Sequence, residues 1–302
     1  MDWDIAYVMV EVEYDYPLYR PPSEANSLIF QVTLGCSFNK CSFCNMYRSK
    51  EYSERPWEEI KSEIDIISKS YPRAEKVFLA DGDALNLSTQ NLIQILDYIK
   101  MKFPNMKRIS SYAMPKNLLQ KNPEELKLLN RKGLNMLYVG IETGYDLLLK
   151  KITKGATSKS IVEACCKAKK SGFVLSCMII LGIGGKKYSV EHIRETARVV
   201  SEASPDYLAA LNLILEDGVY DEFMQKFGEQ FESVDDSLVL DELELLVSNI
   251  NPSSSIIFRA NHASNVYSVG GNLPEDRDKM ISLIRSLKVH PELLKPKVLR
   301  RF

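Results

Sequence analysis

The stretch that decides the fold is Ser27–Tyr47, SLIFQVTLGCSFNKCSFCNMY, in which an apolar run leads directly into three clustered cysteines. Residues 27–33 are rich in β-favouring side chains and almost continuously apolar, which is typical of a strand buried on both faces. Cys36, Cys41 and Cys44 then follow within nine residues. Clustered cysteines in a chain without a secretory signal favour metal binding over disulfides.

The cysteine cluster predicts a [4Fe–4S] site that leaves one iron without a protein ligand. Iron–sulfur clusters are held by thiolates at short spacings, whereas structural zinc usually takes four protein ligands. The three histidines, His192, His262 and His290, are all distant from the cysteines in sequence. A zinc site would need one of them to fold back, so a zinc-stabilised binding or scaffold protein remains the less favoured alternative.

A repeated alternation of strands and helices follows the cysteines and predicts an α/β fold. We expect a parallel sheet with outer helices, curled by right-handed crossovers into a partial (β/α)6 TIM-like barrel. The expected organisation is an N-terminal lead-in over 1–26, a barrel core over 27–215 and an α-rich appendage over 216–302 that covers the barrel mouth. The six core strands are expected over 27–33, 76–80, 107–113, 134–141, 173–181 and 207–215.

Composition and charge narrow the class of protein. The chain has 302 residues, with 39 basic and 40 acidic side chains and a formal net charge of −1. No global field therefore attracts nucleic acid or an anionic membrane. The first residues lack the order of a signal peptide, and the apolar runs are too short to span a bilayer. We expect a cytoplasmic enzyme with no nucleic-acid partner and no membrane.

The cysteine motif resembles that of radical S-adenosylmethionine (SAM) enzymes, in particular the group likened to oxygen-independent coproporphyrinogen oxidase and Elongator. The resemblance covers roughly residues 27–215. The common family motif has three residues between its first two cysteines, whereas this chain has C-x4-C-x2-C. The resemblance implies that Cys36, Cys41 and Cys44 bind the cluster. It also implies that the backbone of Phe43, the aromatic residue before the third cysteine, meets the adenine of SAM.

The resemblance implies further SAM contacts at the ends of later strands. They are Asp81, Gly82 and Asp83 for the methionyl ammonium, Tyr112, Glu142 for the ribose, Lys154 for the carboxylate, and Asn212. Lys154 stands where relatives carry an arginine, and a lysine supplies the charge without a bidentate fork. An ordinary Asp-Gly turn, a surface lysine and a satisfied core amide are the alternatives for Asp81–Asp83, Lys154 and Asn212.

The implied activity is reductive cleavage of SAM to a 5′-deoxyadenosyl radical that abstracts hydrogen from a substrate. Such an enzyme is oxygen-sensitive and needs a reductant such as flavodoxin or ferredoxin. No second cysteine cluster, RNA-binding module or cobalamin domain is evident, so we expect a small-molecule or peptide substrate. An RNA-modifying radical SAM enzyme remains an alternative. So does a conventional barrel enzyme that binds phosphate at Gly184-Gly185 and uses the cysteines for electron transfer.

One polar stretch outside the barrel core is a candidate for the substrate side. Phe258–Asn265, FRANHASN, offers donors and acceptors on a loop after a short apolar strand. We expect Arg259 and His262 to line the substrate cavity. A hydrogen-bonded turn that joins the appendage to the core is an equal alternative, because loops have both roles.

Overall fold

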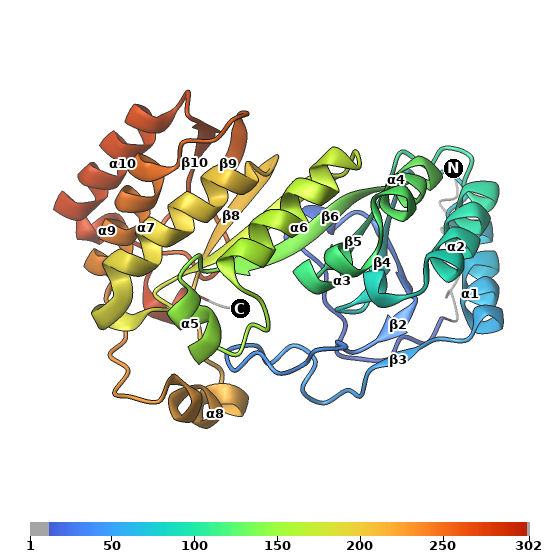
Figure 1. Ribbon diagram of the computed structural model, residues 1–302, viewed down its shortest axis with the longest axis horizontal. Coiled ribbons are helices and arrows are strands. Elements are labelled where there is room, and N and C mark those ends of the chain that lie inside the picture. The colour runs from blue at the N-terminus through green and yellow to red at the C-terminus, as the bar shows by residue number, and fades with distance from the viewer. Residues whose placement is uncertain (1–11, 301–302) are drawn as a thin grey trace, which may run out of the picture.

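The computed structural model describes residues 12–300, and its centre is one eight-stranded sheet (Figure 1). Six parallel strands match the six expected ones, so the predicted α/β partial barrel is confirmed. Two further strands extend the sheet, one parallel and one antiparallel to its neighbour. In sheet order the strands are β1 Leu28–Gln31, β4 Lys76–Ala80, β5 Arg108–Ala113, β6 Leu134–Glu142, β7 Val174–Leu181, β8 Tyr207–Asn212, β9 Ile256–Ala260 and β10 Val269–Leu273. A separate ribbon pairs β2 Thr33–Leu34 with β3 Ser53–Glu54.

Most of the helices lie along the outer face of this sheet, whereas the helix over Asp217–Phe227 lies away from it (Figure 1). A helix between successive core strands was expected, but three of the observed helices were missed, over Pro115–Gln120, Asp146–Lys151 and Asp217–Phe227. α3 begins at Pro115, which the sequence indicated only as a strand end, although proline is also favoured in the first turn of a helix. The helices are α1 Trp57–Ser70, α2 Thr89–Lys102, α3 Pro115–Gln120, α4 Pro123–Lys132, α5 Asp146–Lys151, α6 Ser158–Lys170, α7 Gly185–Ala203, α8 Asp217–Phe227, α9 Asp236–Asn249 and α10 Arg277–Val289, with 3-10 turns at Pro22–Glu24, Ala84–Asn86, Pro291–Leu293 and Lys297–Leu299.

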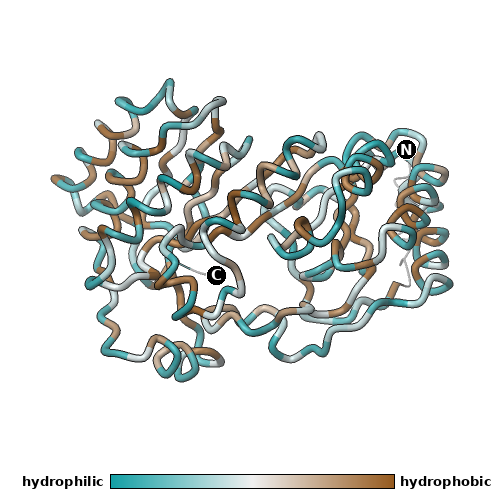
Figure 2. Tube along the Cα trace, in the orientation of Figure 1, coloured by the Kyte–Doolittle hydropathy of each residue, from teal (hydrophilic) through white to brown (hydrophobic). Residues whose placement is uncertain are grey.

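The two faces of the sheet carry different side chains. Val77 and Leu79 of β4 face the helices in the main core, whereas Phe78 and Ala80 face the concave side. The trace is accordingly mostly hydrophobic along the strands, whereas it alternates between hydrophobic and hydrophilic residues along the helices (Figure 2). No helix within residues 12–300 combines the length and the apolar composition that crossing a membrane requires.

The described part of the lead-in crosses the concave face of the first strands; residues 1–11 of the predicted lead-in lie outside the described residues. Glu24 is fully buried there, where the Tyr138 hydroxyl donates to its carboxylate at 2.6 Å and Arg108 forms an ion pair with it at 3.0 Å. Gln31 and Asp15 exchange hydrogen bonds of 2.9 and 2.8 Å. These buried polar contacts fix the lead-in against the sheet.

The segment after residue 215 adds β9 and β10 to the same sheet as well as three helices. Only the short strand over 256–259 was expected among these strands. Gly270 and Gly271 lie in the edge strand β10. Whether this segment covers the barrel mouth stays a prediction.

Glu242 joins α9 to the glycine turn after β7. Its buried carboxyl accepts the Gly182 N–H at 2.6 Å and the Ser189 hydroxyl at 2.8 Å. Burial raises the pKa of Glu242 to about 7, and these two hydrogen bonds offset only part of that effect. The protonated carboxyl is therefore the form that the folded chain prefers.

The raised pKa of Glu242 predicts a specific pH dependence of stability. Because the pKa is above its ordinary 4.5, the stabilising contribution of this group is complete below pH 4.5 and is lost as the pH rises through about 7. The loss amounts to about 3 kcal/mol. Glu242→Gln keeps an uncharged group of the same shape, so its unfolding free energy relative to wild type should rise by that amount between pH 5 and 8, measured by urea unfolding.

Glu244→Gln is the matched control on the same helix. Glu244 is paired with Lys288 and Arg285, which lower its pKa, so this variant should not gain stability with rising pH. Parallel pH curves for wild type and Glu242→Gln would contradict the assignment.

Candidate cofactor site

The three cysteines lie in a loop at the carboxyl-terminal edge of the sheet, the edge where barrel proteins place their ligand sites. We define the cysteine loop as residues 35–50, which follow β2. Cys36, Cys41 and Cys44 are free thiols, each partly exposed. The ends of β4 and β6 lie against this loop through the contacts described below.

Arg48 fixes the backbone of the cysteine loop. Its guanidinium donates to three carbonyl oxygens, those of Asn39 at 2.9 Å, Cys41 at 2.7 Å and Cys44 at 3.1 Å. The planar guanidinium of an arginine presents its N–H donors in fixed directions. The three N–H donors of a lysine ammonium can rotate. The Cys44 N–H also donates to the Cys41 carbonyl at 3.1 Å. Sequence reasoning missed Arg48, because nothing in the motif shows which carbonyls need a donor.

Asp81, predicted to meet SAM, anchors the start of the cysteine loop. Its buried carboxylate accepts the Gly35 N–H at 2.9 Å, the Lys50 ammonium at 3.0 Å and the Gln31 amide at 3.1 Å. The Gly82 N–H donates to the Gly35 carbonyl at 3.1 Å. Gly35 has φ +67°, a conformation that favours glycine. The direct role of Asp81 and Gly82 toward SAM stays a prediction.

Asp83 has a free acceptor beside the loop. Its side chain is fully buried, and one carboxylate oxygen accepts the Ser37 hydroxyl while Oδ1 has no hydrogen-bond partner. Burial raises the pKa of Asp83 to about 6, although the Ser37 hydroxyl and the nearby Asn117 amide oppose the shift. The side chain is therefore placed to gain from a cationic ligand.

Some of the unpartnered buried polar atoms lie close to the cysteines. Within residues 12–300, eight buried side-chain nitrogen or oxygen atoms lack a hydrogen bond, and three belong to Ser42, Tyr47 and Asp83. Each such atom costs about 1–3 kcal/mol unless a partner is supplied. Their grouping against three thiols is what a protein shows when a bound group completes the site. The donor set therefore fits an iron–sulfur cluster.

The thiols need a positive partner to ionise. Burial raises the pKa of all three cysteines, that of Cys41 to about 12. Metal coordination overrides such a shift, since the ion holds the thiolate form. Among residues 12–300, no three or more His, Cys, Asp or Glu side chains converge as a site for one metal ion. A cluster makes a different demand, because each thiolate binds a separate iron.

Glu142 and Lys154, predicted separately from the sequence, form one ion pair. The Lys154 ammonium donates to Glu142 at 2.7 Å, and each side chain is 11% exposed. Burial alone would lower the pKa of Lys154, but Glu142 and the Cys41 and Cys44 thiols outweigh it and raise the pKa. The pair therefore lies beside the cysteines. Gly140 makes room for it, since a Cβ there would lie 1.9 Å from Glu142 Oε1.

The other predicted SAM contacts have partners within the protein. Phe43 packs against an apolar cluster that contains Ile183 and Phe223. Tyr112 lies edge-on to Phe78 with ring centroids 5.1 Å apart. Asn212 is buried, and its side-chain oxygen accepts the Asn265 amide at 3.1 Å. The Asn212 side chain thus has a hydrogen-bond partner within the core, as the alternative from the sequence had it. The roles of Phe43, Tyr112 and Asn212 toward SAM stay predictions.

The polar stretch after β9 forms a turn against the sheet. The Asn265 amide also donates to the Ala210 carbonyl at 3.0 Å, and His262 Nδ1 lies 2.9 Å from the Ser264 hydroxyl. These contacts form the hydrogen-bonded turn between the appendage and the core that was one of the two alternatives from the sequence. The strand register pairs Arg259 with Ala209, which places Arg259 on the concave face, where it is exposed. The substrate role of Arg259 and His262 stays a prediction.

α8 was missed by sequence reasoning, and it closes over the cysteine loop. The Asn45 amide donates to Glu216, the residue before α8, at 2.5 Å, and Arg48 pairs with Glu222 at 3.2 Å. In Figure 1 α8 lies below the main body, beside the loop. The only signal was the helical spacing of three buried residues, Val219, Phe223 and Phe227.

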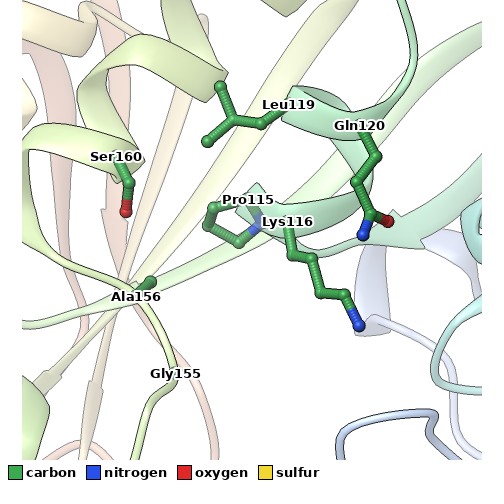
Figure 3. A pocket seen from close by; sticks show the side chains of 7 residues that line it. All are labelled: Pro115, Lys116, Leu119, Gln120, Gly155, Ala156 and Ser160. Carbon is green, nitrogen blue, oxygen red and sulfur yellow. The ribbon is translucent and has the colours of Figure 1, made fainter.

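A shallow groove borders the other side of the cysteine loop (Figure 3). Its volume is about 350 Å³, and it lies between α3 and the start of α6. Gly155, in its wall, packs so closely on Phe38 that a Cβ would lie 2.5 Å from the ring. The groove is lined by Pro115, Lys116, Leu119, Gln120, Gly155, Ala156 and Ser160.

Comparisons with known proteins show the family and the fold of the chain. The family model described as the Radical SAM superfamily matches residues 30–200. The heme chaperone HemW of Bacillus subtilis (strain 168) is 26% identical over 194 residues, which are 63% of this chain and 50% of HemW. Coproporphyrinogen III oxidase (HemN) from Escherichia coli superposes with a TM-score of 0.55 at 16% identity, over 74% of this chain and 51% of that one. Methylornithine synthase (PylB) gives 0.52 at 18% identity, over 88% and 81%.

These matches cover only part of the related proteins. The chain spans about half the length, or less, of the first curated relatives that it matches. The structural neighbours are less than 25% identical, so they show the fold alone. The likeness to the group of coproporphyrinogen oxidase, expected from the sequence, is confirmed.

The three carbonyl contacts of Arg48 predict a loss of cofactor when its fork is removed. Arg48→Lys keeps the charge but cannot satisfy three carbonyls in one plane. We expect at least a twofold lower iron and sulfide content after anaerobic reconstitution, because the cysteine backbones lose their common anchor. Glu222→Gln is the matched control, since it removes only the contact to α8. Equal iron content in wild type and Arg48→Lys would contradict this role.

Proposed function

The chain belongs to the radical SAM superfamily, and from that premise we propose that it is an enzyme that cleaves SAM reductively. Cys36, Cys41 and Cys44 would hold a [4Fe–4S] cluster. The observation that carries the proposal is the grouping of three thiols with three unpartnered buried polar atoms at one sheet edge. When bound, the cluster would supply the electron that splits SAM into methionine and a 5′-deoxyadenosyl radical.

The residues around the cysteines supply complementary charges for SAM. The free Asp83 oxygen would accept the methionyl ammonium, a charge-assisted contact. Lys154 has three donors, so it can keep Glu142 while it binds the carboxylate of SAM. Glu142 would accept the ribose hydroxyls, and Phe43 would meet the adenine. Tyr112, Asp81, Gly82 and Asn212 complete the proposed set.

We propose a small-molecule or peptide substrate that reaches the concave face from the side of β8 and β9. The first strands are filled there by Phe78, Tyr138 and the lead-in, whereas Tyr207 and Arg259 are exposed on the same face. Arg259 and His262 would lie on the substrate side. The electron would come from a cytoplasmic flavodoxin or ferredoxin. We propose no nucleic-acid partner, because the formal net charge of −1 gives the chain no overall attraction to phosphates.

Haem binding is a second candidate, and the similarity to HemW over 194 residues favours it. HemW is described as a heme chaperone, and the chain matches half of it. Titration with hemin, followed by the Soret absorbance, separates the candidates. A saturable shift at one equivalent without SAM cleavage would favour the haem role.

Reductive SAM cleavage predicts a defined product. Anaerobically reconstituted protein with SAM and dithionite should release 5′-deoxyadenosine, detected by liquid chromatography and mass spectrometry. The Cys36→Ser, Cys41→Ser and Cys44→Ser variants should each abolish it, because a missing thiolate removes a ligand of the cluster. Cys166→Ser, on α6, is the control and should behave as wild type. One zinc per chain without iron or sulfide would instead support the zinc-stabilised alternative.

The free oxygen of Asp83 predicts a selective loss of SAM affinity. Asp83→Asn keeps the shape and can still bond Ser37, but it removes the charge that would meet the ammonium. We expect the dissociation constant of SAM to rise about tenfold or more, measured by equilibrium dialysis on cluster-loaded protein. Asp97→Asn, which breaks an outer ion pair with Lys132, is the control. Unchanged affinity in Asp83→Asn would refute the contact.

A further inference from the structure

Tyr47 is buried in the cysteine loop, yet its hydroxyl has no hydrogen-bond partner. The side chain is 4% exposed. Its backbone carbonyl is fixed by the Asn39 amide at 2.8 Å and by the Lys50 N–H at 3.1 Å. A phenylalanine would fill the same space without burying an unpaired hydroxyl. The phenol at this position therefore indicates an acceptor that the protein itself does not provide.

The ring of Tyr47 is held in one place. It packs so tightly on Gly82 that a Cβ there would lie 2.5 Å from Tyr47 Cε2. Tyr19 of the lead-in meets it edge-on, with ring centroids 5.6 Å apart. The Gly82 N–H bonds the carbonyl of Gly35, the residue directly before Cys36. Tyr47 itself comes three residues after Cys44, and its ring packs on the glycine that bonds the start of the cysteine motif.

The surroundings make the hydroxyl a donor. Burial raises the pKa of Tyr47, and the neighbouring Tyr112, Asp81, Cys36 and Cys44 raise it further. The phenol therefore keeps its proton. Both Asp81 oxygens already accept hydrogen bonds, from Gly35 and Lys50 on one and from Gln31 on the other. Cys36 and Cys44 are close enough to influence Tyr47, so the sulfur atoms of the cysteine site, and whatever is bound to them, are acceptors within its surroundings.

We propose that the Tyr47 hydroxyl donates a hydrogen bond to a sulfur atom of the cluster that the three cysteines hold, and thereby raises its reduction potential. The inference rests on the proposed function and deepens it. A hydrogen bond to a cluster sulfur stabilises the more negative, reduced state. Tyr47 thus tunes the cofactor and does not ligate it. The carboxylate of SAM is the competing acceptor, and the experiment separates the two.

The test is Tyr47→Phe, which removes only the hydroxyl and leaves the ring packed on Gly82. Wild-type and variant proteins are reconstituted anaerobically, and their clusters are titrated without SAM, with the reduced form followed by electron paramagnetic resonance. We expect equal iron and sulfide content and a reduced state about tenfold less favoured in the variant. This corresponds to a potential about 59 mV lower for a one-electron couple. SAM affinity should change by less than about twofold.

Tyr98→Phe is the matched control. The Tyr98 hydroxyl donates to Asp65 at 2.8 Å on the outer helices, so the loss of this phenol should leave the potential unchanged. If the Tyr47→Phe protein binds less cluster than wild type, the titration still measures the reduction potential of those molecules that contain one.

A potential in Tyr47→Phe equal to that of wild type would overturn the inference. If SAM binding is also about tenfold weaker in that variant, the nucleotide is the acceptor of the hydroxyl. A wild-type protein that binds no cluster would refute the proposed function itself, and this outcome is distinct from both.

Discussion

The buried Asp81 carboxylate is the contact on which the cysteine site depends. It joins the end of β4 to the first residue of the loop, Gly35, and to Lys50 at the loop's far end. The Lys50 side chain is 5% exposed and that of Asp81 is fully buried, so neither charge has water as a substitute partner. Breaking such a pair typically costs about 3–5 kcal/mol. One carboxylate thus closes an irregular loop, which Arg48 then stiffens from within.

The site combines a rigid frame with unsatisfied groups. Arg48 and Asp81 use their hydrogen-bonding capacity on the protein, whereas Ser42, Tyr47 and Asp83 each retain a buried polar atom without a partner. Such atoms lower the stability of the cluster-free chain, and a bound group that satisfies them is favoured by the same amount. Cofactor binding and folding stability are therefore coupled at this loop.

The sequence was sufficient to predict a feature where one residue type, or one spacing of apolar residues, has a single physical interpretation. The continuous apolar run at β4 predicted that strand with its observed bounds, and the cysteine spacing indicated the superfamily that the family model shows. Arg48 and the pairing of Glu142 with Lys154 were not predictable as contacts, because their partners are set by loop geometry. β10 was missed because its two glycines carry no strand signal, and only pairing with β9 makes the segment a strand.

The unequal filling of the concave face follows from the same arrangement. The lead-in covers the first strands. Its Glu24 is held there because Tyr138 and Arg108 satisfy the buried carboxylate. At the other end, β10 is antiparallel and carries Gly270 opposite Arg259. A Cβ at Gly270 would lie 2.9 Å from Arg259 Cδ, so a larger residue there would displace the Arg259 side chain. The position of Arg259 on this face thus depends on a glycine in the edge strand, while the lead-in over the first strands depends on a buried carboxylate.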